Sequence, residues 1–168
     1  HVPQPLTELK ESIKDCLVSA GMRETISYPL TTLELLERAN IPGDLTPLRI
    51  ANPMSREFEF LRTSLRGSIL KTLSDNTRTT LKDGARLFEI GRLYVRSDED
   101  EKDLPKELEM LVGVIAGPRY PLSWLSQEID MNFFDGKGIL TSMFEQLNVD
   151  AKYSRAIDST MHPDRVAH

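Results

Sequence analysis

The spacing of hydrophobic residues along the chain alternates between a helical period and a strand-like period. Apolar residues recur every three or four positions in four stretches, which predicts four helices. These helices are expected at residues 5–20, at 33–39, from Ser64 onward and at 133–147. Gly21 follows the first where a C-cap glycine is expected, and Thr31 or Thr32 can cap the second. The residues expected to face inward from the last two helices are Leu65, Ile69, Leu70, Leu73, Ile139, Leu140, Met143, Phe144 and Leu147.

Short alternating or continuous apolar runs predict the strands. They are expected at residues 24–29, 48–51, 85–95, 107–117 and 151–157. Alternation within 85–95 places Glu89 on one face and Arg92 on the other, and we expect Glu89 to take Arg62 or Arg92 as its partner. The run from 110 to 116 is almost continuously apolar, which favours burial on both faces. A short acidic connection joins the two longest strands, so we expect them to be antiparallel neighbours.

These elements predict an α+β domain with a mainly antiparallel sheet flanked by helices. Of the 168 residues, 39% are hydrophobic and 28% are charged, as in ordinary soluble domains. At this length we expect residues 1–168 to form a single domain. Because the chain begins with His1 rather than Met and stops abruptly at His168, we also expect it to be a fragment of a longer chain.

Composition argues against several classes of function. The net charge of −5 argues against a domain that grips a nucleic-acid backbone by bulk electrostatics, and we expect no DNA partner. Cys16 is the only cysteine, which excludes a disulfide framework, and its place among apolar positions predicts a buried side chain. The histidines His1, His162 and His168 lie near the ends, so no interior histidine cluster can bind a metal. No apolar run approaches about 18 residues, so we expect a soluble cytoplasmic protein and no membrane segment.

The motifs of common enzyme classes do not occur in the sequence. There is no GxxxxGK[ST] phosphate loop, no GxSxG elbow and no HExxH helix. The Gly-Lys-Gly triplet at 136–138 is interpreted as the start of a helix, with Asp135 placed favourably at its N-terminus. Phe133 and Phe134 are predicted to pack rather than to stack on a base.

The segment at 52–65 is too particular for a random connector. An Asn-Pro pair opens it and favours a turn, and the hydroxyls of Thr63 and Ser64 can cap the helix that follows. Arg62 stands beside these hydroxyls and is suited to pair with a carboxylate or a phosphate. A salt bridge that fixes the turn is the simpler interpretation, and a ligand site is the alternative.

Four sequence motifs occur in a characteristic order. They are Asn52-Pro53-Met54-Ser55 with Leu61-Arg62-Thr63-Ser64-Leu65, then Arg86-Leu87-Phe88-Glu89-Ile90-Gly91-Arg92, then Phe133-Phe134-Asp135-Gly136-Lys137-Gly138, then His162-Pro163-Asp164-Arg165. In order and spacing they closely resemble the catalytic-like core domain of the bacterial-type phenylalanine–tRNA ligase beta chain. The resemblance covers essentially all 168 residues but only part of a full beta chain, which is several times longer.

The resemblance implies a fold, a partner and a division of labour. The fold is the antiparallel sheet flanked by helices of class II aminoacyl-tRNA synthetases. In this family the alpha chain uses ATP and magnesium to make phenylalanyl-adenylate and to charge the tRNA, while the beta core is a degenerate copy. The holoenzyme is a heterotetramer of two alpha and two beta chains. The resemblance therefore implies a non-catalytic module with no cofactor of its own, with the alpha chain as partner and tRNA in the full complex.

The sequence departs from a working class II site. With Glu89 placed on the glutamate of the second motif of catalytic class II enzymes, the arginine that would neutralise the α-phosphate falls on Leu87. The third motif, a glycine run ending in an arginine, does not occur, and Asp164 replaces the usual glycine of the last motif. We therefore predict no catalysis and no ATP binding by this chain alone, and we interpret Glu89 and Arg92 as a vestigial site. The alternative is a small ATP-dependent ligase that activates a carboxylate on a class II-like fold, which would require phosphate-binding arginines on the sheet.

The 52–65 segment is the predicted contact with the alpha chain. In class II enzymes the first-motif region forms the subunit interface, and we place that region here. The predicted interface residues are Asn52, Pro53, Ser55, Phe58, Phe60, Leu61, Arg62 and Thr63. Phe58, Phe60 and Leu61 would supply apolar anchors and Arg62 directional charge. The alternative is that these aromatic residues fill the domain's own core.

Overall fold

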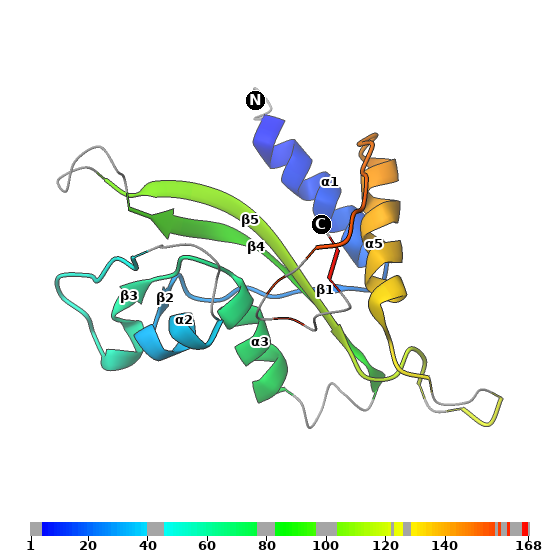
Figure 1. Ribbon diagram of the computed structural model, residues 1–168, viewed down its shortest axis with the longest axis horizontal. Coiled ribbons are helices and arrows are strands. Elements are labelled where there is room, and N and C mark those ends of the chain that lie inside the picture. Colours follow the sequence, from blue (N-terminus) through cyan, green and yellow to red (C-terminus); the bar gives the residue numbers. More distant parts are fainter. Residues whose placement is uncertain are drawn as a thin grey trace.

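The computed structural model describes residues 5–39, 46–76, 83–96, 104–121, 123–125, 129–156, 158, 161 and 166–167 (Figure 1). The helices in these residues are α1 (Pro5–Ser19), α2 (Leu33–Ala39), α3 (Arg66–Asp75) and α5 (Phe133–Gln146), with a 3₁₀ turn η1 (Arg56–Phe58). The strands are β1 (Arg23–Glu24), β2 (Leu30–Thr31), β3 (Phe60–Leu61), β4 (Ala85–Val95) and β5 (Lys106–Ala116). The acidic residues 97–103 and the motif at 162–165 lie outside the described residues.

The central sheet has the strand order β1–β4–β5. β4 and β5 are antiparallel along eleven paired positions, from Ala85 opposite Ala116 to Val95 opposite Lys106. β1 pairs in parallel with the other edge of β4, and β2 and β3 form a separate antiparallel pair. The predicted α+β class with a mainly antiparallel sheet is confirmed, and so is the pairing of the two long strands.

The two faces of the β4–β5 ribbon pack against different helices (Figure 1). Phe88 is fully buried and belongs to a hydrophobic cluster with residues of α1 and α5. Gly91 lies three positions further along β4, on the opposite face, and it lies against Arg62 and Leu65. α1 and α5 therefore cover one face of the ribbon, while α3 and the segment that precedes it cover the other.

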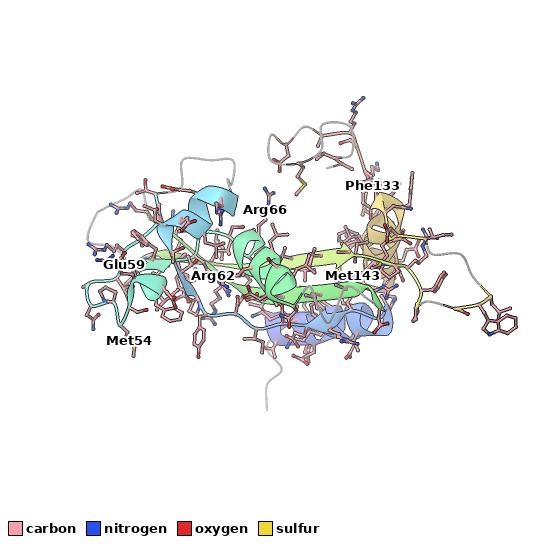
Figure 2. The ribbon with its side chains drawn as sticks, turned by 90° about the horizontal axis from the view of Figure 1, so that it is seen from below. Met54, Glu59, Arg62, Arg66, Phe133 and Met143 are labelled. Carbon is pink, nitrogen blue, oxygen red and sulfur yellow. The ribbon has the colours of Figure 1, made fainter. Side chains whose placement is uncertain are left out.

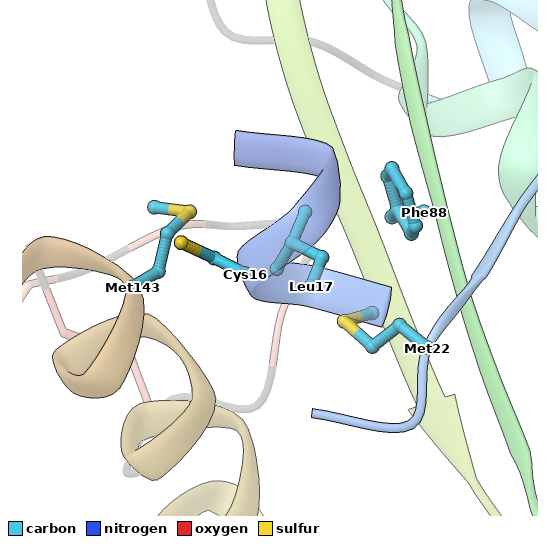
Figure 3. Packing of buried hydrophobic residues seen from close by; sticks show 5 residues of the cluster. All are labelled: Cys16, Leu17, Met22, Phe88 and Met143. Atoms are coloured by element: carbon cyan, nitrogen blue, oxygen red, sulfur yellow. The ribbon is translucent and has the colours of Figure 1, made fainter. Parts of the chain in front are cut away.

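The main hydrophobic cluster joins α1, β4 and α5 (Figure 3). Its buried members are Cys16, Leu17, Met22, Phe88 and Met143. Cys16 is 8% exposed and its thiol lies 3.2 Å from the side-chain oxygen of Gln146 in α5, which confirms the predicted buried cysteine. Because the cluster draws on segments far apart in the sequence, burial of its apolar surface fixes α1 and α5 on the sheet.

A side-chain cap marks the start of α5, and a serine hydroxyl lies at the start of α3. The Asn132 side-chain oxygen accepts a hydrogen bond from the Phe134 N–H at 2.9 Å, and the Asp135 carboxylate accepts one from the Asn132 N–H at 2.8 Å. This capping box confirms the predicted position of Asp135 in the first turn. The Ser64 hydroxyl accepts from the Arg66 N–H at 3.0 Å, so the helix predicted from Ser64 begins two residues later and uses Ser64 as its hydroxyl partner.

The strand predicted at 24–29 is wrong in its extent. Only Glu24 of that range belongs to β1, and the ladder with β4 stops there. The Thr25 N–H still donates to the backbone oxygen of Phe88, but the N–H and hydroxyl of Ser27 bond to the Glu89 carboxylate instead of the β4 backbone. A side chain of β4 therefore replaces its backbone as the partner of this segment.

Four further predictions differ from the structure. Residues 48–51 form a single bridge, Arg49 with Phe60, rather than a strand, and residues 151–156 likewise contribute only the bridge of Arg155 with Ala167. Burial of residues 110–116 on both faces is wrong, because no position of β5 is fully buried and its first five residues are exposed. Within the described residues β5 has β4 as its only strand neighbour, and an edge strand is covered by other residues less than a central strand is. Leu70, expected to face inward, is 46% exposed.

Candidate functional site

A buried arginine–glutamate pair lies at the centre of the candidate site (Figure 2 labels Arg62). The side chains of Arg62 and Glu89 are 6% and 2% exposed, and Arg62 Nη1 donates to Glu89 Oε1 at 2.7 Å. Arg62 Nε donates to the backbone oxygen of Arg92 at 2.9 Å. The structure thus brings Glu89 together with Arg62, and the interpretation of Arg62 as the partner in an internal salt bridge is confirmed.

Ser27 completes the hydrogen bonding of this pair. Its hydroxyl lies 2.8 Å from both carboxylate oxygens of Glu89 and accepts a hydrogen bond from Arg62 Nη1 at 2.8 Å. Its backbone N–H also donates to Glu89 Oε1 at 3.3 Å. Both carboxylate oxygens therefore have donors, as a buried charge requires.

The backbone of Arg62 links three segments of the chain. Its N–H donates to the Pro29 oxygen at 2.9 Å, and its C=O accepts from the Tyr94 N–H at 3.0 Å. Gly91 leaves the space for the guanidinium, because a Cβ at that position would lie 2.3 Å from Arg62 Nη2. A side chain larger than hydrogen at this position would displace the ion pair.

Arg92 does not belong to this cluster. Its side chain projects from the opposite face of β4, is 58% exposed and contacts Glu107 at 2.7 Å and Glu109 at 3.2 Å. Hydrogen bonds with Glu109 and then with Glu107 raise the pKa of Arg92. Glu109 also binds Lys10 of α1, and that hydrogen bond is the main cause that lowers the pKa of Glu109. Of the two residues predicted for a vestigial site, only Glu89 faces Arg62.

The face of the sheet that carries Glu89 is apolar around it. The positions opposite Leu87, Glu89 and Gly91 on β5 are Val114, Val112 and Met110. Leu87, which the resemblance places where catalytic class II enzymes carry a phosphate-binding arginine, is a buried hydrophobic residue. Arg62 is the cation hydrogen-bonded to Glu89, and its Nε and Nη1 donors already have protein acceptors.

The predicted interface residues divide into an exposed part and a buried part. Asn52 and Ser55 are exposed, while Pro53, Phe58, Phe60 and Leu61 are half-buried. Arg62 and Thr63 are buried inside the domain. We call residues 52–61 the arm; its Met54 is 97% exposed (Figure 2).

An aromatic pair and a groove lie beside the arm. The Phe58 ring packs edge-to-face against Tyr28 with centroids 5.7 Å apart, and Tyr28 is 76% exposed. Both residues line a groove of about 700 Å³ between α2, η1 and α3. Sequence reasoning missed Ser27; the signal available was a small polar residue between two large side chains, Ile26 and Tyr28, in an extended segment.

The part of the chain that is described contains neither a cluster of metal-ligating side chains nor a helix that could span a membrane. No group of three or more His, Cys, Asp or Glu side chains in the described ranges is arranged to hold a metal ion. None of the described helices has the length and apolar character needed to cross a bilayer.

Comparison with known proteins identifies relatives over most of the chain. The family model described as "Phenylalanyl tRNA synthetase beta chain CLM domain" matches residues 1–168. A phenylalanine–tRNA ligase beta subunit of Dehalococcoides mccartyi (strain CBDB1) is 39% identical over 149 residues, which are 89% of this chain and 18% of that protein. The corresponding subunit of Bacillus cereus (strain ZK / E33L) is 32% identical over 161 residues, 94% of this chain and 20% of that protein. The chain therefore spans about a fifth of the length of the curated relatives it matches.

Solved structures share the fold at low sequence identity. A pyrrolysyl-tRNA synthetase from Desulfitobacterium hafniense superposes with a TM-score of 0.66 at 18% identity, over 92% of this chain and 51% of that chain. A second structure, of PylSc from the same organism, gives a TM-score of 0.64 over 89% of this chain and 49% of that chain. The fold is thus that of a class II-like tRNA synthetase core, as predicted. With a family match along its whole length, the chain belongs to the family of the phenylalanyl-tRNA synthetase beta chain CLM domain.

Proposed function

We propose that the chain is the non-catalytic core domain of a phenylalanine–tRNA ligase beta subunit and that it supports assembly with the alpha subunit. In this proposal the alpha subunit attaches phenylalanine to its tRNA in the cytoplasm, with ATP and magnesium, as a step of protein biosynthesis. Two alpha and two beta chains form the complex. The family match and the relatives named phenylalanine–tRNA ligase beta subunit support this setting.

The observation that supports a non-catalytic role is that Arg62 is hydrogen-bonded inside the domain. Adenylate formation needs cations placed where negative charge develops on the phosphates. Arg62 is buried and its Nε and Nη1 groups donate to Arg92 O, Ser27 and Glu89. A guanidinium that is 6% exposed and bonded within the domain is not available to a nucleotide.

The described residues around Arg62 and Glu89 do not fit a magnesium–triphosphate group. The Glu89 carboxylate is 2% exposed, and both of its oxygens accept hydrogen bonds inside the domain, so they are not presented to a metal ion. The strand positions opposite Glu89 and its neighbours are apolar. We therefore assign ATP and magnesium to the alpha subunit and derive no step through them here.

The arm and the Tyr28–Phe58 pair are the proposed contact with the alpha subunit. Met54 and Tyr28 expose large apolar surfaces, and Tyr28 and Phe58 line the groove of about 700 Å³ beside α3. Apolar anchors beside a polar rim are typical of protein interfaces. Arg62 contributes indirectly in this proposal, because it holds the base of the arm against β4.

Co-purification of full-length subunits tests the assembly role. We expect the double substitution Tyr28→Asp and Met54→Asp in the beta chain to abolish co-purification with the alpha chain while leaving the beta chain folded. The matched control is Tyr120→Asp, since Tyr120 is 62% exposed and lies outside the arm. Unchanged co-purification of the double variant would overturn the proposed contact surface.

A pyrophosphate-exchange assay separates this proposal from the alternative of a carboxylate-activating ligase. The chain alone is expected to give no phenylalanine-dependent exchange of pyrophosphate into ATP, because Leu87 and the bonded Arg62 offer no phosphate clamp. Exchange above background would refute the non-catalytic assignment.

A further inference from the structure

A groove beside the start of α5 forms a second candidate site, separate from Arg62 and Glu89. It measures about 570 Å³, within the usual range of ligand pockets of roughly 300–1,000 Å³. Its walls come from the first turn of α5 and from the two segments joined by the Arg155–Ala167 bridge. Figure 2 labels Phe133 at the N-terminal end of α5, on the wall of this groove.

The aromatic rings in this groove are exposed. Phe134 is 75% exposed and Phe133 is 40% exposed, with their rings edge-to-face and centroids 5.6 Å apart. The prediction that this pair packs is therefore wrong for Phe134. An exposed phenylalanine next to a groove offers a flat surface on which a nucleobase can stack.

The charged lining of the groove is cationic. Lys137 Nζ lies 4.8 Å from the centre of the Tyr153 ring, and the Tyr153 hydroxyl lies 3.1 Å from the Thr141 hydroxyl. Tyr153 is thus held by α5 on both sides. Lys137 and Arg155 are the charged lining residues among the described ones, with no carboxylate in the lining, although the chain carries a net charge of −5.

Asp135, in the first turn of α5, is already paired inside the domain. Asp135 accepts from the Asn132 N–H and binds Arg119 Nη2 at 2.9 Å, and it does not line the groove. The backbone hydrogen bond from Asn132 is the main cause that lowers the pKa of Asp135. The charge of the groove is therefore complementary to an anionic ligand.

We propose that this groove binds an unpaired segment of RNA, with a base on the Phe134 ring and a phosphate near Lys137. Aromatic faces combined with cations are the chemistry with which proteins bind single-stranded nucleic acid. A ring that is 75% exposed suits a polymer that covers it from outside better than a small enclosed ligand. The choice of RNA rests on the proposed function within a tRNA ligase, while the groove chemistry does not depend on assembly with the alpha subunit.

Fluorescence anisotropy of the assembled full-length enzyme with a fluorescein-labelled 12-nucleotide oligouridine tests the site. Phe134→Ala is expected to weaken binding about 10-fold, since stacking contributes roughly 1–3 kcal/mol per base. Lys137→Gln is expected to reduce the slope of log K against log salt by about 0.7, the value for one phosphate contact on a single strand. The controls Tyr120→Ala and Lys152→Gln change an exposed aromatic and an exposed lysine outside the groove and are expected to have no effect.

Four results would overturn this proposal. The first is that the Phe134→Ala and Lys137→Gln enzymes bind the oligomer as tightly as the unaltered enzyme. The second is that photo-crosslinks from a 4-thiouridine oligomer map away from Phe134 and Tyr153. Displacement of the oligomer by AMP at equal nucleotide concentration would mark a mononucleotide pocket instead. Loss of alpha-subunit co-purification in Phe134→Ala, with oligomer binding unchanged, would mark a protein interface. If oligomer binding fails while the Tyr28 and Met54 variants still disrupt assembly, only this inference falls.

Discussion

Replacing Arg62 with methionine is expected to destabilise the domain strongly. Glu89 is 2% exposed, and in this variant its carboxylate would keep only Ser27 as a donor. Removing one partner of a buried ion pair costs roughly 3–5 kcal/mol, because the remaining charge has neither water nor a counter-ion. The Arg92 backbone oxygen also loses its donor. A domain of ordinary stability, about 5–15 kcal/mol, would lose roughly a fifth of its free energy of unfolding or more.

Thermal unfolding of the chain, followed by circular dichroism, measures this effect. For a domain of this size each kcal/mol shifts the Tm by roughly 2–4 °C, so a loss of about 4 kcal/mol predicts a fall of roughly 8–16 °C. Arg62→Lys keeps a positive charge beside Glu89, so its Tm should fall less than that of Arg62→Met. Its Tm should still fall, because lysine lacks the guanidinium fork that reaches Ser27, Glu89 and Arg92 O.

A double substitution distinguishes the loss of the pair from the loss of packing. Arg62→Met combined with Glu89→Leu removes the unpaired charge as well, and it should recover most of the stability lost in Arg62→Met. A Tm fall below about 2 °C in the single variant would refute the reasoning. A double variant whose loss equals the sum of the two single losses would refute it equally, since independent sites add and coupled sites do not.

Three further predictions concern the glycine, the cap and the surface ions. Gly91→Ala should lower the free energy of unfolding, measured by chemical denaturation, by roughly 1–3 kcal/mol, because the alanine Cβ would lie 2.3 Å from Arg62 Nη2. Asn132→Ala should cost about 1 kcal/mol in the same assay through loss of the capping box. The hydrogen bond from Lys10 lowers the pKa of Glu109 below its ordinary 4.5. The stability that this ion pair contributes is therefore present above pH 4.5 and is lost as the pH falls through the lowered pKa of Glu109. In Lys10→Gln the Tm should consequently decline less steeply on the acid side.

The elements with local signals could be predicted from the sequence. Gly21 has φ of 80°, as a C-cap glycine should, and the Thr32 hydroxyl accepts from the Leu35 N–H at 3.1 Å at the start of α2. β4 was predicted at its observed bounds because its alternation is long, and α5 at nearly its observed bounds because capping and periodicity agree. These signals involve residues within a few positions of one another.

Features that depend on distant residues could not be predicted with the same certainty. Arg62 pairs with Glu89, 27 positions away, and binds Ser27, 35 positions away, so the sequence left a carboxylate and a phosphate as alternatives. A continuous apolar run does not distinguish a central strand from an edge strand, which is why the sequence did not predict the exposure of β5. Phe134 was missed for a related reason, since helical spacing cannot reveal which aromatic residues a neighbouring segment covers.

Arg62 connects the loss of phosphate chemistry with the proposed role in assembly. Its backbone bonds to Pro29 and Tyr94, and its side chain bonds to Glu89 and to the Arg92 oxygen, so it fixes the base of the arm to β4. A guanidinium that holds the arm in this way cannot also move to meet a phosphate, because a nucleotide would have to break a buried ion pair and the hydrogen bonds of Arg62 Nε and Nη1. A cation kept free for phosphate would, in turn, leave Glu89 unpaired at 2% exposure and the arm without this anchor. The same side chain can serve catalysis or the placement of the arm, and its geometry here serves the arm.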